Sequence, residues 1–203
     1  MKKVVFALFF VTSLMTAQDM DVVKGDFSFL KDQKEVNVVF DYSNLKLMKD
    51  NLTNDQYVAN RVKDLEEKGK GTGETWEKKW YASRDLTFEP KFLELMSTVL
   101  TKEKKDVVFK EDLTQAKYTL IVDAVWIYPG YNVGVMKQGA KVSMVLKFVE
   151  TSNKSNVLLE IKSEKAPGDI TFVGSYDNEF RIGEGYAKTA KTLAYMLVKK
   201  AYK

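Results

Sequence analysis

Asp123 is the residue whose setting most favours unusual chemistry, because it is a carboxylate within an otherwise apolar run, Tyr118 to Tyr128. Carboxyl groups buried among apolar side chains are perturbed acids unless a cation pairs with them, and perturbed acids mark candidate sites. Arg84, Arg181 or a lysine would be the pairing cation. The alternative is a structural acid, either hydrogen-bonded within the fold or open to solvent near the edge of a sheet.

The sequence contains no histidine and no cysteine. This excludes a thiolate nucleophile, a disulfide, the commonest general base and the commonest transition-metal ligand. Gly69, Gly71 and Gly73 lack the Gly-Lys-Ser/Thr ending of a phosphate-binding loop, so they predict a flexible connector. We therefore expect no enzyme, no cofactor and no metal ion, with a carboxylate-based hydrolase centred on Asp123 as the last alternative.

A glycine-rich segment, residues 129–139, is longer than a tight turn requires. It contains Tyr131, Val133 and Met136, which we predict to contact a ligand or a partner, because loops carry function more often than the elements they connect. Exposed apolar groups at such a tip would dock a partner by edge pairing or insertion. The alternative is a tip that only continues its two strands, since hairpin loops with glycine are common scaffolding.

The three tryptophans are the remaining candidate contact residues. Trp76 and Trp80 are four residues apart and therefore share one face of a predicted helix. Such an aromatic pair is either part of the core or a patch that faces a ligand or partner. Trp126 lies in the apolar run with Asp123, and together the three would border a site for a small apolar ligand between sheet and helices.

A long hairpin over residues 117–150 is the element that must position these side chains. Its first strand is apolar on both faces, which is typical of a strand inside a sheet. Strict alternation places the even-numbered residues of the run, Trp126 and Tyr128 included, on one face. Amphipathic helices are predicted near 89–103 and 182–202. The sequence thus predicts an α+β sandwich with a mainly antiparallel sheet, in which residues 19–34 form an irregular lead-in.

The first 18 residues predict a secretory signal peptide. Lys2 and Lys3 precede a short apolar run that is followed by small residues, and the run is too short to span a bilayer. The expected domain organisation is therefore a leader, 1–18, and one secreted domain, 19–203, with a helical insertion near 53–87. With no cysteine after the leader, we expect no lipid anchor, and no later segment predicts a transmembrane helix. The expected location is secreted or periplasmic.

The charge balance argues against nucleic acid as a partner. The chain has 32 basic and 28 acidic residues, a formal net charge of +4, and two of the lysines belong to the predicted leader. Basic residues alternate with acidic ones, as in the run from Lys102 to Asp106, rather than gathering on one face as in nucleic-acid binders.

The order of these elements resembles that of a group of bacterial envelope domains. The residues that carry the resemblance are the strand entry QAKYTLIVDAVW and the final helix FRIGEGYAKTAKTLAYMLVKKAYK. The group includes the N-terminal domain of the Tol–Pal translocation protein, the curli-secretion lipoprotein and the lipoprotein activators of penicillin-binding proteins. The resemblance implies an α/β sandwich used in envelope assembly or binding, and it transfers no catalytic residue.

Taken together, these features predict a non-catalytic secreted or periplasmic module that binds a protein or a cell-envelope component. The alternative is a carrier of a small apolar ligand held between the sheet and the helices. A carrier requires a closed apolar cavity, whereas an interaction module requires an exposed patch. A hydrolase would require a second carboxylate or a lysine within reach of Asp123.

Overall fold

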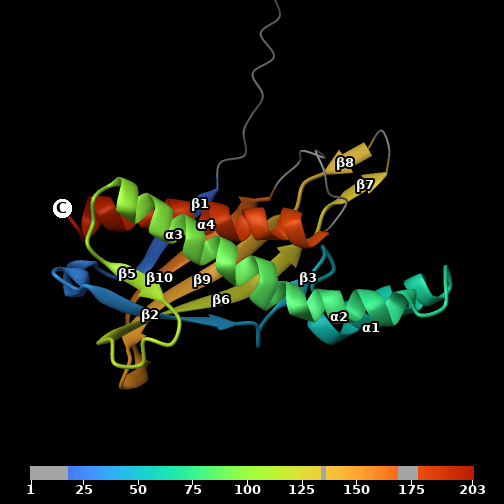
Figure 1. The fold of residues 1–203 in the computed structure, drawn as a ribbon, viewed down its shortest axis with the longest axis horizontal. Coiled ribbons are helices and arrows are strands. Elements are labelled where there is room, and N and C mark those ends of the chain that lie inside the picture. Colours follow the sequence, from blue (N-terminus) through green and yellow to red (C-terminus); the bar gives the residue numbers. More distant parts are fainter. Residues whose placement is uncertain (1–17, 134–135, 169–177) are drawn as a thin grey trace, which may run out of the picture.

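The computed structural model describes residues 18–133, 136–168 and 178–203; the predicted leader therefore lies outside the described residues except for Gln18. The fold is α+β, as the sequence predicts: an open mixed sheet has two long helices, α3 and α4, packed side by side across one face (Figure 1). Its strand order is β1-β10-β9-β6-β2-β5, with β3 and β4 attached beside β6.

The strands are bounded as follows: β1 Asp19–Gly25, β2 Glu35–Asp41, β3 Lys46–Leu47, β4 Leu52–Thr53, β5 Val108–Lys110, β6 Tyr118–Tyr128, β7 Tyr131–Val133, β8 Met136–Gln138, β9 Lys141–Glu150 and β10 Asn153–Pro167. The helices are α1 Asn54–Glu66, α2 Thr72–Ser83, α3 Glu89–Lys102 and α4 Asn178–Lys200, with a short 3-10 turn at Ser28–Leu30 and a π-helical turn, η2, at Arg84–Phe88. No helix in the described part of the chain is long and apolar enough to span a bilayer.

The antiparallel half of the sheet is built around the predicted hairpin of β6 and β9, to which β10 and β1 add in turn. On the other side, β2 pairs in parallel with both β6 and β5. Strand β1 replaces the predicted irregular lead-in. Its residues are largely exposed and its extended conformation depends on the pairing with β10. The distribution of its apolar residues therefore did not predict a strand.

A β-bulge in β6 corrects the predicted alternation of that strand. Ala124 pairs with Met144, but the next pairing is Trp126 with Ser143, so the register shifts by one residue. Because a one-residue shift moves every later side chain to the opposite face, Trp126 and Tyr128 lie on the outer face, away from α3 and α4. The first part of β6 keeps the expected pattern, with Leu120 on the inner face.

The inner face of the sheet and the two long helices enclose the core. Leu120, Val122, Leu146 and Phe148 are fully buried on this side of the sheet. Gly185 permits the close approach of α4: a Cβ atom there would lie 2.6 Å from Val142 Cγ2. The apolar residues on this side pack into one continuous core.

Helices α1 and α2 form an arm that extends beyond one end of the sheet, and the β7–β8 ribbon projects at the same end (Figure 1). The arm begins with a capping box, in which Thr53 and Gln56 satisfy each other's backbone N–H groups. Its inner side is aromatic: the Trp76 and Trp80 rings stack at 5.7 Å. The π-helical turn η2 then joins α2 to α3.

Candidate functional site

The structure distributes the predicted contact residues over three places. Trp126 lies on the outer sheet face, whereas Trp76 and Tyr131 border one groove between the arm and the β7–β8 ribbon. Trp80 is 1% exposed and belongs to the core. The three tryptophans therefore do not border one cavity between the sheet and the helices, because the β6 bulge turns Trp126 outward.

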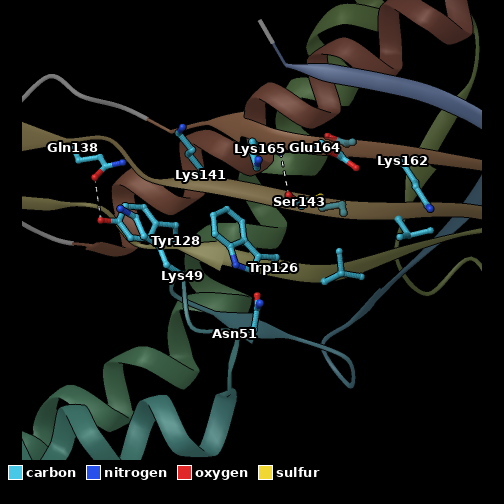
Figure 2. A pocket seen from close by; sticks show the side chains of 14 residues that line it. Lys49, Asn51, Trp126, Tyr128, Gln138, Lys141, Ser143, Lys162, Glu164 and Lys165 are labelled. Carbon is cyan, nitrogen blue, oxygen red and sulfur yellow. Dashed lines mark hydrogen bonds between the residues drawn. The ribbon is translucent and has the colours of Figure 1, made fainter. Parts of the chain in front are cut away.

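A pocket of about 700 Å³ opens on the outer sheet face around Trp126 (Figure 2). We call it the Trp126 pocket. Its residues come from β6, β9 and β10, with the loop between β3 and β4 on one side and β8 on another. They are Lys49, Asn51, Val125, Trp126, Tyr128, Gln138, Lys141, Ser143, Met144, Val145, Lys162, Ser163, Glu164 and Lys165.

Two parallel rings form the aromatic part of the Trp126 pocket. Trp126 and Tyr128 stack with 6.2 Å between ring centroids and 12° between ring planes. Trp126 Nε1 donates to the Met48 carbonyl at 2.9 Å, and the Tyr128 hydroxyl bonds Gln138 Oε1 at 3.1 Å. Both polar ring atoms are thus held by the protein, so the half-buried indole of Trp126 offers a ligand its face.

Lysines surround this aromatic pair. Figure 2 shows Lys141 and Lys165 on one side of the Trp126 indole and Lys49 on the other, with Lys162 farther along the sheet. Glu164 is the one acidic residue of the pocket. Within residues 18–133, 136–168 and 178–203, none of these four lysines forms an ion pair. The pocket therefore has a net positive charge that the described protein does not neutralise.

No protein-family model matches the chain, and no curated protein sequence matches it. Among solved structures, a PelC dodecamer from Paraburkholderia phytofirmans is 11% identical and gives a TM-score of 0.39, over 91% of this chain and 99% of that chain. A homologue of a neuraminyllactose-binding hemagglutinin from Helicobacter pylori is 17% identical, with a TM-score of 0.29 over 86% and 90% of the two chains. At such low scores, neither similarity carries an argument about this chain.

Asp123 is buried and pairs with a lysine, which was one of the cations that the sequence analysis proposed. Its side chain is 4% exposed, and Lys147 Nζ lies 3.1 Å from Asp123 Oδ2, while the Lys147 side chain keeps 30% of its area exposed. Oδ1 is buried and has no hydrogen-bond partner in the described part of the protein. Asp41 lies opposite Asp123 on the neighbouring strand. Asp123 is not among the residues that line the Trp126 pocket.

The predicted hairpin tip is a two-stranded ribbon, β7 and β8. Tyr131 and Met136 are 40% and 59% exposed, so both side chains are accessible at the tip. The Val133 side chain lies outside the described residues, as do residues 134–135. Tyr131 and Trp76 line a groove of about 950 Å³, which also includes Arg61. The structure thus joins two candidates that are far apart in the sequence.

A polar cluster that sequence analysis did not identify lies between β2 and the start of α3. Tyr42 donates its hydroxyl proton to Glu89 Oε1 at 3.0 Å, and the Arg84 guanidinium lies 4.4 Å from the centre of the Tyr42 ring. Burial raises the pKa of Glu89 above its ordinary value, although the Tyr42 hydrogen bond acts against that shift. Burial also raises the pKa of the Tyr42 and Tyr186 hydroxyls.

Replacing Glu89 with glutamine should remove a pH-dependent part of the stability. An acid whose pKa is higher in the folded state than unfolded stabilises the fold most when it is protonated. The wild type should therefore lose thermal stability relative to Glu89→Gln as the pH rises from about 4.5 through the folded pKa. Melting temperatures of both proteins across this range test the prediction. The prediction is wrong if the melting temperature of the wild type rises relative to that of Glu89→Gln as the pH increases.

Proposed function

We propose that this chain is a non-catalytic module that binds a negatively charged component of the cell envelope at the Trp126 pocket. The observation that carries the proposal is the group of lysines, without ion pairs in the described part of the chain, around a stacked Trp126–Tyr128 pair. This group lies on a sheet face that α3 and α4 leave open. Stacked rings and fixed cations are binding features, and opposite charge attracts and orients a partner. The predicted export of the chain supports an envelope component as that partner.

The chemistry of the pocket favours binding over catalysis. A serine nucleophile needs a base within hydrogen-bond distance of its hydroxyl group. Ser143 Oγ instead accepts a hydrogen bond from the Lys165 backbone N–H at 3.0 Å. In the described part of the protein, no lysine side chain hydrogen-bonds this hydroxyl group. Ser143 therefore supports the pocket wall rather than attacking a substrate.

Trp126→Ala tests the proposal directly. Loss of the indole removes the half-buried aromatic surface of the pocket. The apparent affinity of the variant for protease-treated envelopes of the source organism should therefore fall at least tenfold. Protease treatment restricts the partner to a component other than protein. Cosedimentation at increasing envelope concentration gives the apparent affinity of each variant.

Tyr195→Ala is the matched control for this experiment. Tyr195 is an aromatic residue that is 38% exposed on α4, the helix that packs on the opposite face of the sheet. Its loss should leave envelope binding unchanged. Melting temperatures of both variants identify any loss of folding. A folded Trp126→Ala protein that binds envelopes like the wild type excludes the pocket as the binding site.

A further inference from the structure

We infer that the ligand of the Trp126 pocket is a carboxylate-bearing saccharide, with one sugar ring stacked on the Trp126 indole and its carboxylates bound by the surrounding lysines. This inference rests on the function proposed above and specifies its ligand. It depends on three features of the pocket: the half-buried indole, the kind and arrangement of the cations, and the amide groups at the rim.

The indole of Trp126 offers a flat apolar surface and no hydrogen bond. One face is stacked against Tyr128, and Nε1–H already donates to the Met48 carbonyl. Val125 and Val145, both half-buried, add apolar surface to the pocket lining. An aromatic face has a negative quadrupole that attracts partially positive C–H groups. Pyranose rings present a face of C–H groups, so this surface suits a sugar ring.

The cations around the ring suit carboxylates. Lys141 and Lys165 lie on one side of the indole and Lys49 on the other, so charges carried on both edges of a sugar chain would meet an ammonium group (Figure 2). Each ammonium group is a compact charge on a flexible stem that adapts to a single carboxylate. A hydrogen bond between such ions is about twice as strong as a neutral one.

Amide groups at the rim complete a surface for hydroxyl groups. Gln138 accepts the Tyr128 hydroxyl proton through Oε1, and its Nε2 takes no part in that bond. Asn51 is exposed beside Lys49. Side-chain amides both donate and accept hydrogen bonds, as sugar hydroxyls require. The volume of about 700 Å³ also lies within the range of about 300–1,000 Å³ that is typical of small-molecule pockets.

Single-stranded nucleic acid also combines rings with negative charge, but the pocket suits it less well. Proteins that bind single-stranded nucleic acid have a basic groove that follows the nucleic-acid backbone, with arginines and with aromatic side chains on which successive bases stack. The chain has only three arginines, Arg61, Arg84 and Arg181, and none lines the pocket. An anionic lipid surface would instead require apolar side chains that protrude from the protein, whereas Trp126 is half-buried within the pocket.

Titration with defined probes tests the ligand class. The probes are trigalacturonate, the neutral galactose trimer of the same linkage, a single-stranded oligonucleotide and phosphatidylglycerol vesicles. Trigalacturonate should shift the indole N–H resonance of Trp126, which the Trp126→Phe spectrum identifies, and should bind at least tenfold more tightly than the neutral trimer. Binding should weaken with added salt, because exposed charges are screened. Equal binding of both trimers, or tighter binding of the oligonucleotide or the vesicles, overturns the inference.

Lysine variants separate this inference from the proposed function. Lys141→Gln/Lys165→Gln should weaken trigalacturonate binding at least tenfold, whereas Lys191→Gln, at an exposed position on α4, should leave it unchanged. If Trp126→Ala loses envelope binding but trigalacturonate does not bind, the saccharide class is wrong and the envelope function stands. If trigalacturonate binds but none of the pocket variants alters envelope binding, the proposed function is wrong.

Discussion

Replacing Trp80 with alanine is expected to lower the free energy of unfolding by about 3–5 kcal/mol. The side chain is 1% exposed and lies 5.3 Å from the Tyr57 ring and 6.4 Å from the Phe88 ring, measured between ring centroids. Its Nε1 also donates to Asn54 Oδ1 at 3.0 Å, which the variant would leave with one partner fewer. Domains are stable by about 5–15 kcal/mol, so the variant should be close to unfolding.

Trp76→Ala is the matched control, because it removes the same residue type one helical turn earlier. Trp76 is only half-buried, and its indole borders the groove that contains Tyr131. We expect a loss about half as large or smaller, since the effect follows the area removed from the core. Urea unfolding followed by circular dichroism measures both variants. Equal losses would contradict the assignment of Trp80 to the core and Trp76 to the surface.

The large effect at Trp80 follows from how the arm joins the body of the protein. The Trp80 ring contacts Phe88 in the π-helical turn, and Phe88 stacks on Tyr186 of α4 with centroids 5.1 Å apart. These side chains form a continuous aromatic connection from α2 to the helix that covers the sheet. The region predicted as a helical insertion therefore shares the core, and removing Trp80 should destabilise more than the arm.

Sequence analysis predicted the helices and strands whose apolar residues recur at a regular spacing along the chain. The apolar faces of the helices place α3 at Glu89–Lys102 and α4 at Asn178–Lys200, close to the predicted 89–103 and 182–202. The hairpin predicted over 117–150 corresponds to β6 and β9. In each of these elements, apolar residues recur with the period of the structure, so the sequence alone contains the necessary information.

The candidate site could not be predicted, because it depends on one register shift. Alternation along β6 places Trp126 beneath the helices, and only the bulge after Ala124 brings it to the outer face beside Ser143. A bulge depends on both paired strands, so the pattern of one strand does not reveal it. Lys49, from the loop between β3 and β4, and Lys165, from β10, line the pocket although both are distant from Trp126 in the sequence. Strand β1 was missed for a similar reason, since its pairing with β10 is its main stabilising contact.

The second large effect is expected at the buried ion pair, and it should be asymmetric. Lys147→Met removes the ammonium group 3.1 Å from Asp123 and keeps most of the aliphatic stem, so a buried carboxylate loses its cation. Breaking a buried pair in this way costs about 3–5 kcal/mol, and we expect about 3 kcal/mol because Lys147 is partly exposed. Asp123→Val leaves a lysine that can turn to solvent, so its loss should stay within about 1 kcal/mol.

A double-mutant cycle with Asp123→Val/Lys147→Met separates the pair from its surroundings. The double variant should be about as stable as Asp123→Val alone, because removing Lys147 does harm only while the carboxylate is present. Urea unfolding of the four proteins gives the coupling energy. Equal losses in the two single variants would show instead that Asp123 stabilises the fold through contacts other than Lys147.

The sign of the Asp123→Val effect also distinguishes the two interpretations of this acid. Asp123 Oδ1 is buried without a hydrogen-bond partner in the described part of the protein, and Asp41 lies opposite on the next strand. An unsatisfied buried oxygen near a second carboxylate opposes folding. If valine makes the protein more stable, Asp123 is retained at the expense of stability, as is typical of residues kept for function. A clear loss of stability would make it a structural acid, and the hydrolase alternative would lose its central residue.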